Sequence, residues 1–335
     1  MTRFTYADGI RQAIAEEMDR DPNVFVIGED VAAPGGVFGV TKGLFDTYGP
    51  DRLWDTPISE EVVVGAAVGA ALLGARPIAE IMFSDFVTLA MDMIVNQAAK
   101  THYMTGGRLS VPMVVRMVTG TGGSTSAQHS QSLESWFVHA PGLKVVAPSS
   151  PEDAKGLLKT AIRDPDPVMF FEHKQLYGGR GGPAGDVVEV DPIPFGVGRV
   201  WREGTDVTVV SYLKTLEYTM KAVEVLAEEG ISCEVWEPRT LVPFDHEGLR
   251  ASLAKTGRLV IAHEAPVRGG FGAEIAAFAA EKCFELLHAP IVRVGGTNTP
   301  MPYAPLMEGF VVPGPERIAD GIRQSLGRGT AANSN

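Results

Sequence analysis

Short β-branched runs alternate with helical stretches along almost the whole chain. The run Val24–Ile27 precedes an apolar helical stretch that begins at Ser59, and the run Pro77–Met82 precedes a helical stretch at residues 86–101. Strands that alternate with helices in this way favour a parallel sheet with helices on both faces. The sequence therefore predicts an α/β fold of the doubly wound kind.

The alternation falls into two blocks, which predict two domains. The first block is predicted to hold strands at residues 24–27, 77–82, 113–118, 143–147 and 168–172. The second is predicted to hold strands at 207–210, 233–236, 259–262 and 291–294, with helices at 216–229, 245–256, 273–287 and 316–326. Glycines and prolines crowd the chain between the blocks. We predict domains at residues 1–185 and 201–327, a linker at 186–200 and a disordered tail at 328–335.

The charge balance and the cysteine content narrow the class of protein. Acidic residues outnumber basic ones by 41 to 29, giving a net charge of −12, which argues against nucleic acid or an anionic membrane as the main partner. The longest apolar stretch, residues 62–75, is too short to cross a membrane, which takes about 20 residues. Two isolated cysteines, Cys233 and Cys283, and an N-terminus without a secretory apolar core predict a cytoplasmic protein.

Two glycine-rich loops come close to a dinucleotide-binding fingerprint but do not complete it. Thr125 stands where the third glycine of the loop at 120–125 should be, and Ile275 does so in the loop at 270–275. A bulky residue at that position opposes the close helix–strand packing that the fingerprint needs. The sequence also has no P-loop, nucleophile elbow or His-Glu-x-x-His zinc motif. It therefore gives little support for a nicotinamide enzyme.

Two polar residues in apolar or glycine-rich surroundings are candidates for chemistry. The segment at 54–61 reads Trp-Asp-Thr-Pro-Ile-Ser-Glu-Glu and leads into an apolar helix, so Glu60 lies in the first helical turn. A glutamate there either complements the helix dipole or carries out acid–base chemistry. His129, between a flexible loop and a helix start, is either an exposed or capping residue or a catalytic one.

Gly65 and Gly69 lie four residues apart on one face of the apolar helix, with alanines around them. Small residues at this spacing let a second helix approach closely. The spacing alone leaves two interpretations open, a tight contact within the chain and an interface between subunits.

Five short segments occur in an order and spacing that resemble a known family. They are Gly-Glu-Asp at 28–30, Asp-Thr-Pro-Ile-Ser-Glu at 55–60, Gln-His-Ser-Gln at 128–131, Pro-Gly-Leu-Lys-Val-Val at 141–146 and Arg-Thr-Leu-Val-Pro at 239–243. Over residues 3–326 the chain resembles the beta subunit of the thiamine-diphosphate-dependent first component of 2-oxo acid dehydrogenase complexes. The group includes pyruvate, branched-chain 2-oxo acid and acetoin dehydrogenases. The resemblance implies a transketolase-like pyrimidine-binding domain followed by a transketolase C-terminal domain.

The resemblance also implies roles for individual residues. Glu60 matches the glutamate that activates the cofactor through its pyrimidine ring, and His129 matches the active-site histidine near the thiazolium. Glu29 matches an acidic residue in the tunnel that links paired cofactors. The pair Glu60 and His129 is therefore expected to be catalytic.

Other matches concern binding rather than proton transfer. Ile58, Met82 and Phe86 match positions that pack around the pyrimidine, so we expect them to bind the cofactor together with Glu29 and Glu60. A structural potassium ion is implied at five backbone carbonyls, those of Met113, Ala161, Ile162, Asp164 and Asp166.

The family assembles as an α2β2 tetramer with thiamine diphosphate held between alpha and beta chains. The alpha chain carries the diphosphate and Mg²⁺ motif, Gly-Asp-Gly followed by Asn-Asn, which this sequence lacks because Val187 follows Gly185-Asp186. The resemblance thus implies that this subunit holds the aminopyrimidine end of the cofactor and is inactive alone. A lipoyl-bearing acyltransferase, the second component, would receive the product.

The flanking residues bear on the substrate. Residues 126–134 and 171–174 look most like acetoin-type members, so acetoin is slightly favoured over pyruvate or a branched-chain 2-oxo acid. A transketolase-like C2-transfer enzyme and a non-catalytic scaffold subunit are less favoured alternatives. The presence of both Glu60 and His129 argues against the scaffold.

Overall fold

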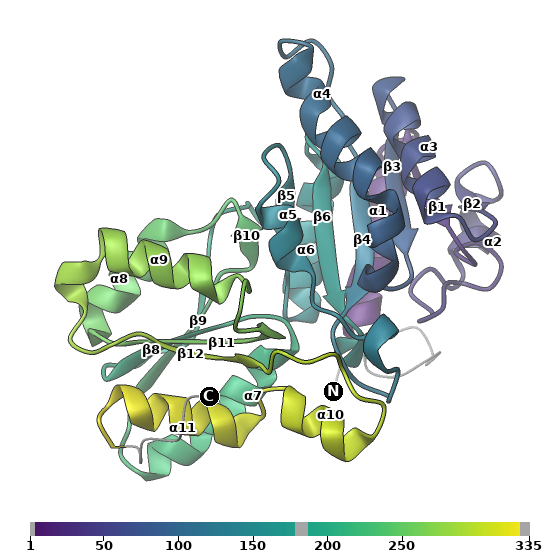
Figure 1. Cartoon of the computed structure of the whole chain (residues 1–335). Coiled ribbons are helices and arrows are strands. Elements are labelled where there is room, and N and C mark those ends of the chain that lie inside the picture. The colour runs from purple at the N-terminus through teal and green to yellow at the C-terminus, as the bar shows by residue number, and fades with distance from the viewer. Residues whose placement is uncertain (1–3, 178–186, 329–335) are drawn as a thin grey trace.

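The computed structural model describes residues 4–177 and 187–328, which form two domains, each built on one sheet (Figure 1). The strands of the first sheet are β1 (Val24–Gly28), β2 (Leu53–Asp55), β3 (Arg76–Ile81), β4 (Val114–Thr119), β5 (Lys144–Val146), β6 (Val168–His173) and β10 (Thr240–Val242). They lie in the order β10-β5-β6-β4-β3-β1-β2. All neighbours are parallel except β10, which pairs antiparallel with β5.

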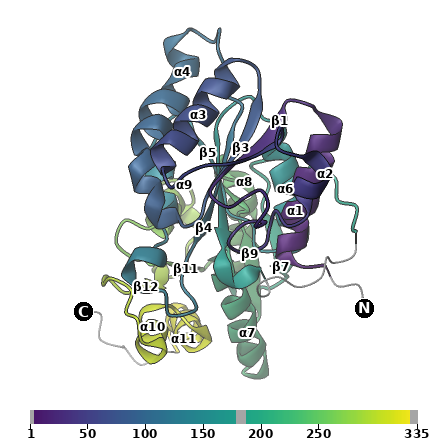
Figure 2. The same ribbon diagram turned by 90° about the vertical axis from the view of Figure 1, so that its right-hand side faces the viewer.

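Helices cover both faces of this sheet (Figure 2). One face carries α1 (Tyr6–Arg20), α2 (Leu44–Tyr48) and α6 (Pro151–Arg163), and the other carries α3 (Glu60–Leu72), α4 (Ala99–Met104) and α5 (Glu134–Val138). Successive strand residues point to opposite faces, so Val24 and Val26 pack in the α1–α6 core while Phe25 and Ile27 pack in the α3 core. This two-sided burial explains why β1 reads as a continuous apolar run.

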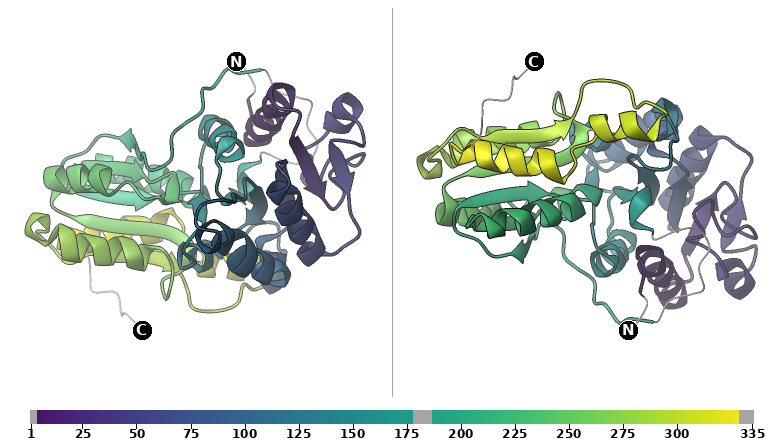
Figure 3. Two further views of the ribbon diagram at one scale, coloured as in Figure 1. Left: turned by 90° about the horizontal axis from the view of Figure 1, so that it is seen from above. Right: turned by 90° about the horizontal axis from the view of Figure 1, so that it is seen from below.

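The second domain repeats the arrangement on a five-stranded sheet. Its strands are β7 (Arg199–Arg202), β8 (Val207–Ser211), β9 (Cys233–Glu237), β11 (Leu259–Pro266) and β12 (Val292–Gly296), in the order β12-β11-β8-β9-β7. Helices α8 (His246–Thr256) and α9 (Gly272–Lys282) lie on one face, and α7 (Lys214–Glu228) and α11 (Pro315–Ser325) on the other (Figures 1 and 3). The prediction of an α/β fold with two doubly wound domains is confirmed.

The two domains share one apolar core. Phe137 and Leu143 of the first domain belong to the same buried cluster as Trp236 and Leu241. Strand β10 follows β9 in the sequence yet pairs with β5 of the first sheet. The later part of the chain therefore completes the edge of the first sheet, and burial at this shared core holds the two sheets together.

The helix predicted at residues 86–101 is present, but its turns are of three kinds. The structure has a 3₁₀ helix at Ser84–Ala90, a π-helix at Asp92–Ala98 and only then α4. The Asp92 carboxylate accepts hydrogen bonds from the side chains of Asn96, at 2.6 Å, and Gln97, at 3.3 Å, so both i+4 and i+5 neighbours are engaged. Apolar periodicity does not separate these helix types, and π-helical turns are frequent at functional sites.

Several short elements escaped prediction because they are too short to show a period. They are β2, β7, β10, α2 and α10 (Pro305–Val311). The helix predicted at 273–287 ends at Lys282 as α9. Residue 186 of the predicted linker and residues 329–335 of the predicted tail lie outside the described residues, and the domain bounds stay predictions. No helix of the described ranges is both long and apolar enough to cross a membrane.

Candidate active site

Glu29 and Glu60 meet at the carboxyl edge of the first sheet. Strand β1 ends at Gly28, which lies in register with Asp55 of β2, and the Thr56 amide donates to the Gly28 carbonyl at 3.0 Å. This contact holds the turn that leads into α3, so Glu60 begins its helix next to Glu29. Carboxyl edges of parallel strands are where such folds bind ligands.

Among the described residues, the Ser59 amide is the one hydrogen-bond donor to this pair of carboxylates. Glu60 is 7% exposed, and no described residue donates a hydrogen bond to its carboxylate. The Oε1 atom of Glu29 is also buried, and it has no hydrogen-bond partner among the described residues. Burial and the charge of Glu60 raise the pKa of Glu29, although a hydrogen bond from the Ser59 amide opposes the shift. Leaving a buried carboxylate oxygen without a donor is costly, so Glu60 and Glu29 Oε1 are free to accept hydrogen bonds from a ligand.

Ser59 precedes α3 but does not cap it through its side chain. Its hydroxyl makes no capping hydrogen bond, and its φ of −171° is extended. The anionic Glu60 and Glu61 in the first turn instead complement the positive end of the helix. The dipole interpretation of Glu60 and a chemical role are therefore compatible.

His129 lies in a separate pocket wall formed by aromatic rings. It ends the short 3₁₀ turn Ala127–His129 after β4. Its imidazole contacts the rings of Phe83 and Phe86 edge-on, with centroid separations of 4.9 and 5.1 Å. Lys174 donates from Nζ to the His129 carbonyl and, at 3.1 Å, to Thr125 Oγ1. The structure thus brings the predicted residues His129 and Phe86 together and fixes the imidazole from two sides.

Two of these neighbours were not predicted as site residues. Phe83 comes two residues after the end of β3, and Lys174 directly follows β6. Their position was the signal that could have identified them, because both residues lie just after a parallel strand, at the edge where ligands bind. Met82 lies half-buried at the same edge, next to Phe83.

Ile58 is 84% exposed and contributes nothing to a pocket within this chain. It belongs to an apolar face that also contains Val62, 60% exposed, and Leu73, 92% exposed, at the two ends of α3. On this helix a Cβ at Gly69 would meet no atom within 4 Å, whereas a Cβ at Gly65 would touch the Met93 side chain at 3.4 Å. Gly65 therefore serves a contact inside the chain, and Gly69 stays open to a further helix.

Four of the five carbonyls predicted to hold potassium already accept hydrogen bonds. Arg76 Nη1 donates to the carbonyls of Ile162, at 2.8 Å, and Asp164, at 3.3 Å. The carbonyls of Ala161 and Met113 accept from backbone amides. A guanidinium at this place competes with a cation, although a carbonyl has two lone pairs. Within the described ranges no group of three or more His, Cys, Asp or Glu could hold a metal, and the potassium site stays a prediction.

Comparisons with known proteins match both domains. The family models for the transketolase pyrimidine binding domain and the transketolase C-terminal domain match residues 2–180 and 196–318. Pyruvate dehydrogenase E1 component subunit beta-2, mitochondrial, of Oryza sativa is 44% identical over 97% of this chain and 87% of its own length. The 2-oxoisovalerate dehydrogenase subunit beta of Bacillus subtilis is 43% identical over 97% of this chain and 99% of its own.

An acetoin enzyme matches equally well. The acetoin:2,6-dichlorophenolindophenol oxidoreductase subunit beta of Cupriavidus necator is 46% identical over 95% of this chain and 96% of its own. The chain belongs to the E1 beta subunits of the 2-oxo acid and acetoin dehydrogenases. The resemblance predicted from five short segments is thereby confirmed. Since three substrate types match to within a few per cent identity, membership of the E1 beta subunits does not choose among them.

A solved structure supports the fold of this E1 beta subunit independently. It is described as a split gene transketolase, inactive beta4 tetramer, and superposes with a TM-score of 0.76 at 24% identity over 97% of this chain and 98% of the other. At that identity the match shows the shared fold and nothing finer.

Proposed function

We propose that this E1 beta subunit supplies the proton-handling half of a thiamine-diphosphate site at the carboxyl edge of its first sheet. The observation that supports it best is the carboxylate pair of Glu29 and Glu60, in which Glu29 Oε1 and the Glu60 carboxylate have no hydrogen-bond donor among the described residues. An aminopyrimidine has a ring nitrogen and an exocyclic amine that suit such a pair. Thiamine diphosphate, when bound, supplies an electron sink for cleaving a carbon–carbon bond next to a carbonyl.

Glu60 is placed to hold the proton that it shares with the pyrimidine ring. Its side chain is buried at the first turn of α3, beside Glu29, so the carboxyl is held at a fixed position next to the ring, as proton transfer by a positioned group requires. Met82 and Phe86, half-buried at the same edge, would supply the apolar walls around the ring.

His129 is placed to bind or protonate an oxygen of the substrate. Its imidazole packs against the edges of Phe83 and Phe86, and its backbone carbonyl accepts a hydrogen bond from Lys174. A ring fixed in this way loses little freedom when it transfers a proton. Glu60 and His129 would therefore act on different partners in one reaction. Glu60 would act on the cofactor and His129 on the substrate.

The alpha subunit would complete the site. The exposed apolar side chains Ile58, Val62 and Leu73 and the open helix surface at Gly69 run along α3 from the end that carries Glu60, and a covering chain would bury them. In an α2β2 assembly the alpha chain would also hold the diphosphate and Mg²⁺, for which this sequence has no motif. A lipoyl-bearing acyltransferase would receive the product.

The reaction we propose is cleavage of acetoin or decarboxylation of a 2-oxo acid, with transfer of the remaining unit to the lipoyl group. The flanking segments at 126–134 and 171–174 favour acetoin slightly. Pyruvate and branched-chain 2-oxo acids are the alternatives, and relatives of all three kinds match this chain.

The test is a Glu60→Gln variant assembled with its alpha subunit. We expect turnover of every candidate substrate to fall by roughly 10²–10⁴-fold, because proton transfer at the cofactor is lost. The matched control is Glu61→Gln, which removes the adjacent, exposed carboxylate and should keep turnover within about twofold. Turnover of Glu60→Gln equal to that of the control would remove the assignment.

A further inference from the structure

The loop at residues 120–131, which carries His129, is anchored at its end by its own domain. Asp85 Oδ1 accepts hydrogen bonds from the amides of Ser130 and Gln131, both at 3.2 Å, and from the Gln131 side chain at 2.9 Å. Ser84 and Thr119 donate to the Gln131 carbonyl. These contacts fix the segment that follows His129.

The start of the same loop is held by the other domain. Glu264, on β11, accepts a hydrogen bond from the Thr121 amide at 2.5 Å, and its second oxygen pairs with His173 Nε2 at 2.8 Å. Glu308, on α10, accepts from the next amide, that of Gly122, at 2.7 Å. Two consecutive amides of the His129 loop are therefore bound by two carboxylates of the second domain.

The backbone of the loop explains why it needs outside acceptors. Positive φ angles occur at Gly120, Gly122, Gly123, Ser124 and Ser126. Such residues continue neither a helix nor a strand, so their amides have no regular partners. Successive amides in this kind of conformation form a concave site for an anion. In this protein the chain's own glutamates fill it, which also explains why the incomplete glycine fingerprint is not a nucleotide site.

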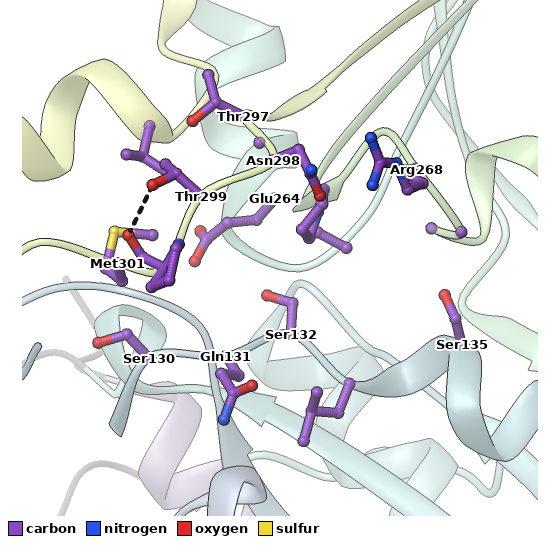
Figure 4. A pocket seen from close by; sticks show the side chains of 18 of the residues that line it. Ser130, Gln131, Ser132, Ser135, Glu264, Arg268, Thr297, Asn298, Thr299 and Met301 are labelled. Atoms are coloured by element: carbon purple, nitrogen blue, oxygen red, sulfur yellow. Dashed lines mark hydrogen bonds between the residues drawn. The ribbon is translucent and has the colours of Figure 1, made fainter. Parts of the chain in front are cut away.

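Gly120 shows how closely the two domains approach here. A Cβ at this position would lie 2.1 Å from His173 Nε2 and 2.9 Å from Glu264 Oε1. Glu264 itself lies between the segments at 297–301 and 130–135, in an interdomain cavity of about 610 Å³ (Figure 4). Burial raises the pKa of Glu264, but His173 and the Thr121 amide outweigh that effect and lower it overall. The group is therefore an anion suited to binding amides.

We propose that Glu264 and Glu308 are positioning residues for His129, through which the second domain holds the start of the catalytic loop. The loop is then set from both ends, by Asp85 of its own domain and by the two glutamates of the other. The proposal rests on the proposed function only for the role of His129, since the contacts themselves do not depend on it.

Glu308 offers the cleaner variants because it is half-exposed and its carboxylate has one partner among the described residues, the Gly122 amide. Glu308→Gln keeps an acceptor oxygen without the charge, and Glu308→Ala removes both. Glu264→Gln tests the other glutamate. The amide side chain has nearly the same size as the carboxylate, so no cavity opens beside the buried His173. The matched control is Glu285→Ala, an exposed second-domain glutamate that pairs with Arg250 far along the chain from the loop.

The experiment uses the variant chain assembled with its alpha subunit and combines two readouts. Hydrogen–deuterium exchange followed by mass spectrometry should show faster exchange at residues 121–131 in Glu308→Ala, with α3 unchanged. At saturating thiamine diphosphate and Mg²⁺, kcat should fall about tenfold in Glu308→Ala and less in Glu308→Gln, in line with the loss of one charge-assisted hydrogen bond. The KM for thiamine diphosphate should stay within about twofold, because Glu60 and Met82 are untouched.

The outcomes separate this proposal from the proposed function. If hydrogen–deuterium exchange at residues 121–131 in Glu308→Ala stays at the level seen in Glu285→Ala, the proposal that the glutamates position the loop is overturned, whatever the turnover. A fall in kcat that comes with an equal rise in the KM for thiamine diphosphate also overturns it, because the effect would then be a general loss of structure. If the wild-type assembly turns over no candidate substrate, the proposed function fails. Accelerated hydrogen–deuterium exchange in Glu308→Ala would then still support positioning of the loop by the two glutamates.

Discussion

The two ends of the candidate site are completed in different ways. At Glu29 and Glu60 two carboxylates have a single hydrogen-bond donor among the described residues, the Ser59 amide, and the neighbouring face of α3 is apolar and open. At the His129 loop, Asp85, Glu264 and Glu308 accept hydrogen bonds from the backbone amides. Under the proposed function a ligand and another chain would complete the first end, while the contacts of the second lie within this chain. Assembly should accordingly change the environment of Glu60 far more than that of His129.

A buried arginine lies on β4, in the middle of the first sheet. Its loss should lower the stability of the chain more than any other change considered below. Arg116 on β4 donates to Glu80 at 2.6 Å and to both oxygens of Glu172 at 2.7 and 2.8 Å. Arg116→Met leaves two buried carboxylates without their cationic partner, although Glu172 keeps a hydrogen bond from the Tyr177 hydroxyl, and should lower the free energy of unfolding by about 3–5 kcal/mol. Urea unfolding measures this loss. Arg116→Lys, which keeps the charge but not the bidentate contact, should lose less, and an equal loss in both variants would contradict the charge argument.

The contact between the domains should depend on pH through Glu237. Burial, and then the charge of Asp153, raise the pKa of this carboxyl from its ordinary 4.5 to about 7. Between these values the folded state keeps a proton that the unfolded state has released, so stability falls as pH rises from about 4.5 to 7, by up to ~3 kcal/mol. Glu237→Gln should flatten this part of the curve in thermal unfolding measured from pH 4.5 to 8. The same slope in wild type and variant would contradict the assignment.

The close packing at the start of the His129 loop predicts different costs for substituting two of its glycines. Gly120→Ala should cost about 1–3 kcal/mol more than Gly123→Ala, since both have positive φ but only Gly120 faces His173 and Glu264. The Gly120 variant should also lose turnover, because it displaces the pair that holds Thr121. Urea unfolding and activity assay of the two assembled variants check both points. Equal losses of stability would show that the start of the His129 loop is less tightly packed than the structure indicates.

The smallest effect on the chain itself is expected at the open end. Gly69→Leu adds a side chain where nothing lies within 4 Å, so the chain alone should keep its stability within about 0.5 kcal/mol. Gly65→Leu, which meets Met93, should destabilise the chain. If the open face docks the alpha subunit, Gly69→Leu should block assembly in size-exclusion chromatography. Normal assembly of Gly69→Leu would place the alpha subunit elsewhere.

The regular parts of the fold follow from the sequence because strands such as β1 and helices such as α6 carry clear apolar periods. The position of Glu60 at the start of α3 was also predictable, from Pro57 and the apolar run. The partners of the His129 loop were not, because Glu264 and Glu308 are more than 130 residues away in the sequence and meet Thr121 and Gly122 only through the packing of two domains. Strand β10 is too short to show a period, and its pairing with β5, which crosses between domains, gives no local signal either.

The central claim is that this chain holds one half of a shared thiamine-diphosphate site. Calorimetric titration of thiamine diphosphate with Mg²⁺ into the chain alone and into its assembly with the alpha subunit tests it directly. The account predicts binding to the assembly, with no measurable heat for the chain alone. Tight binding to the chain alone, or no binding to the assembly, would contradict it.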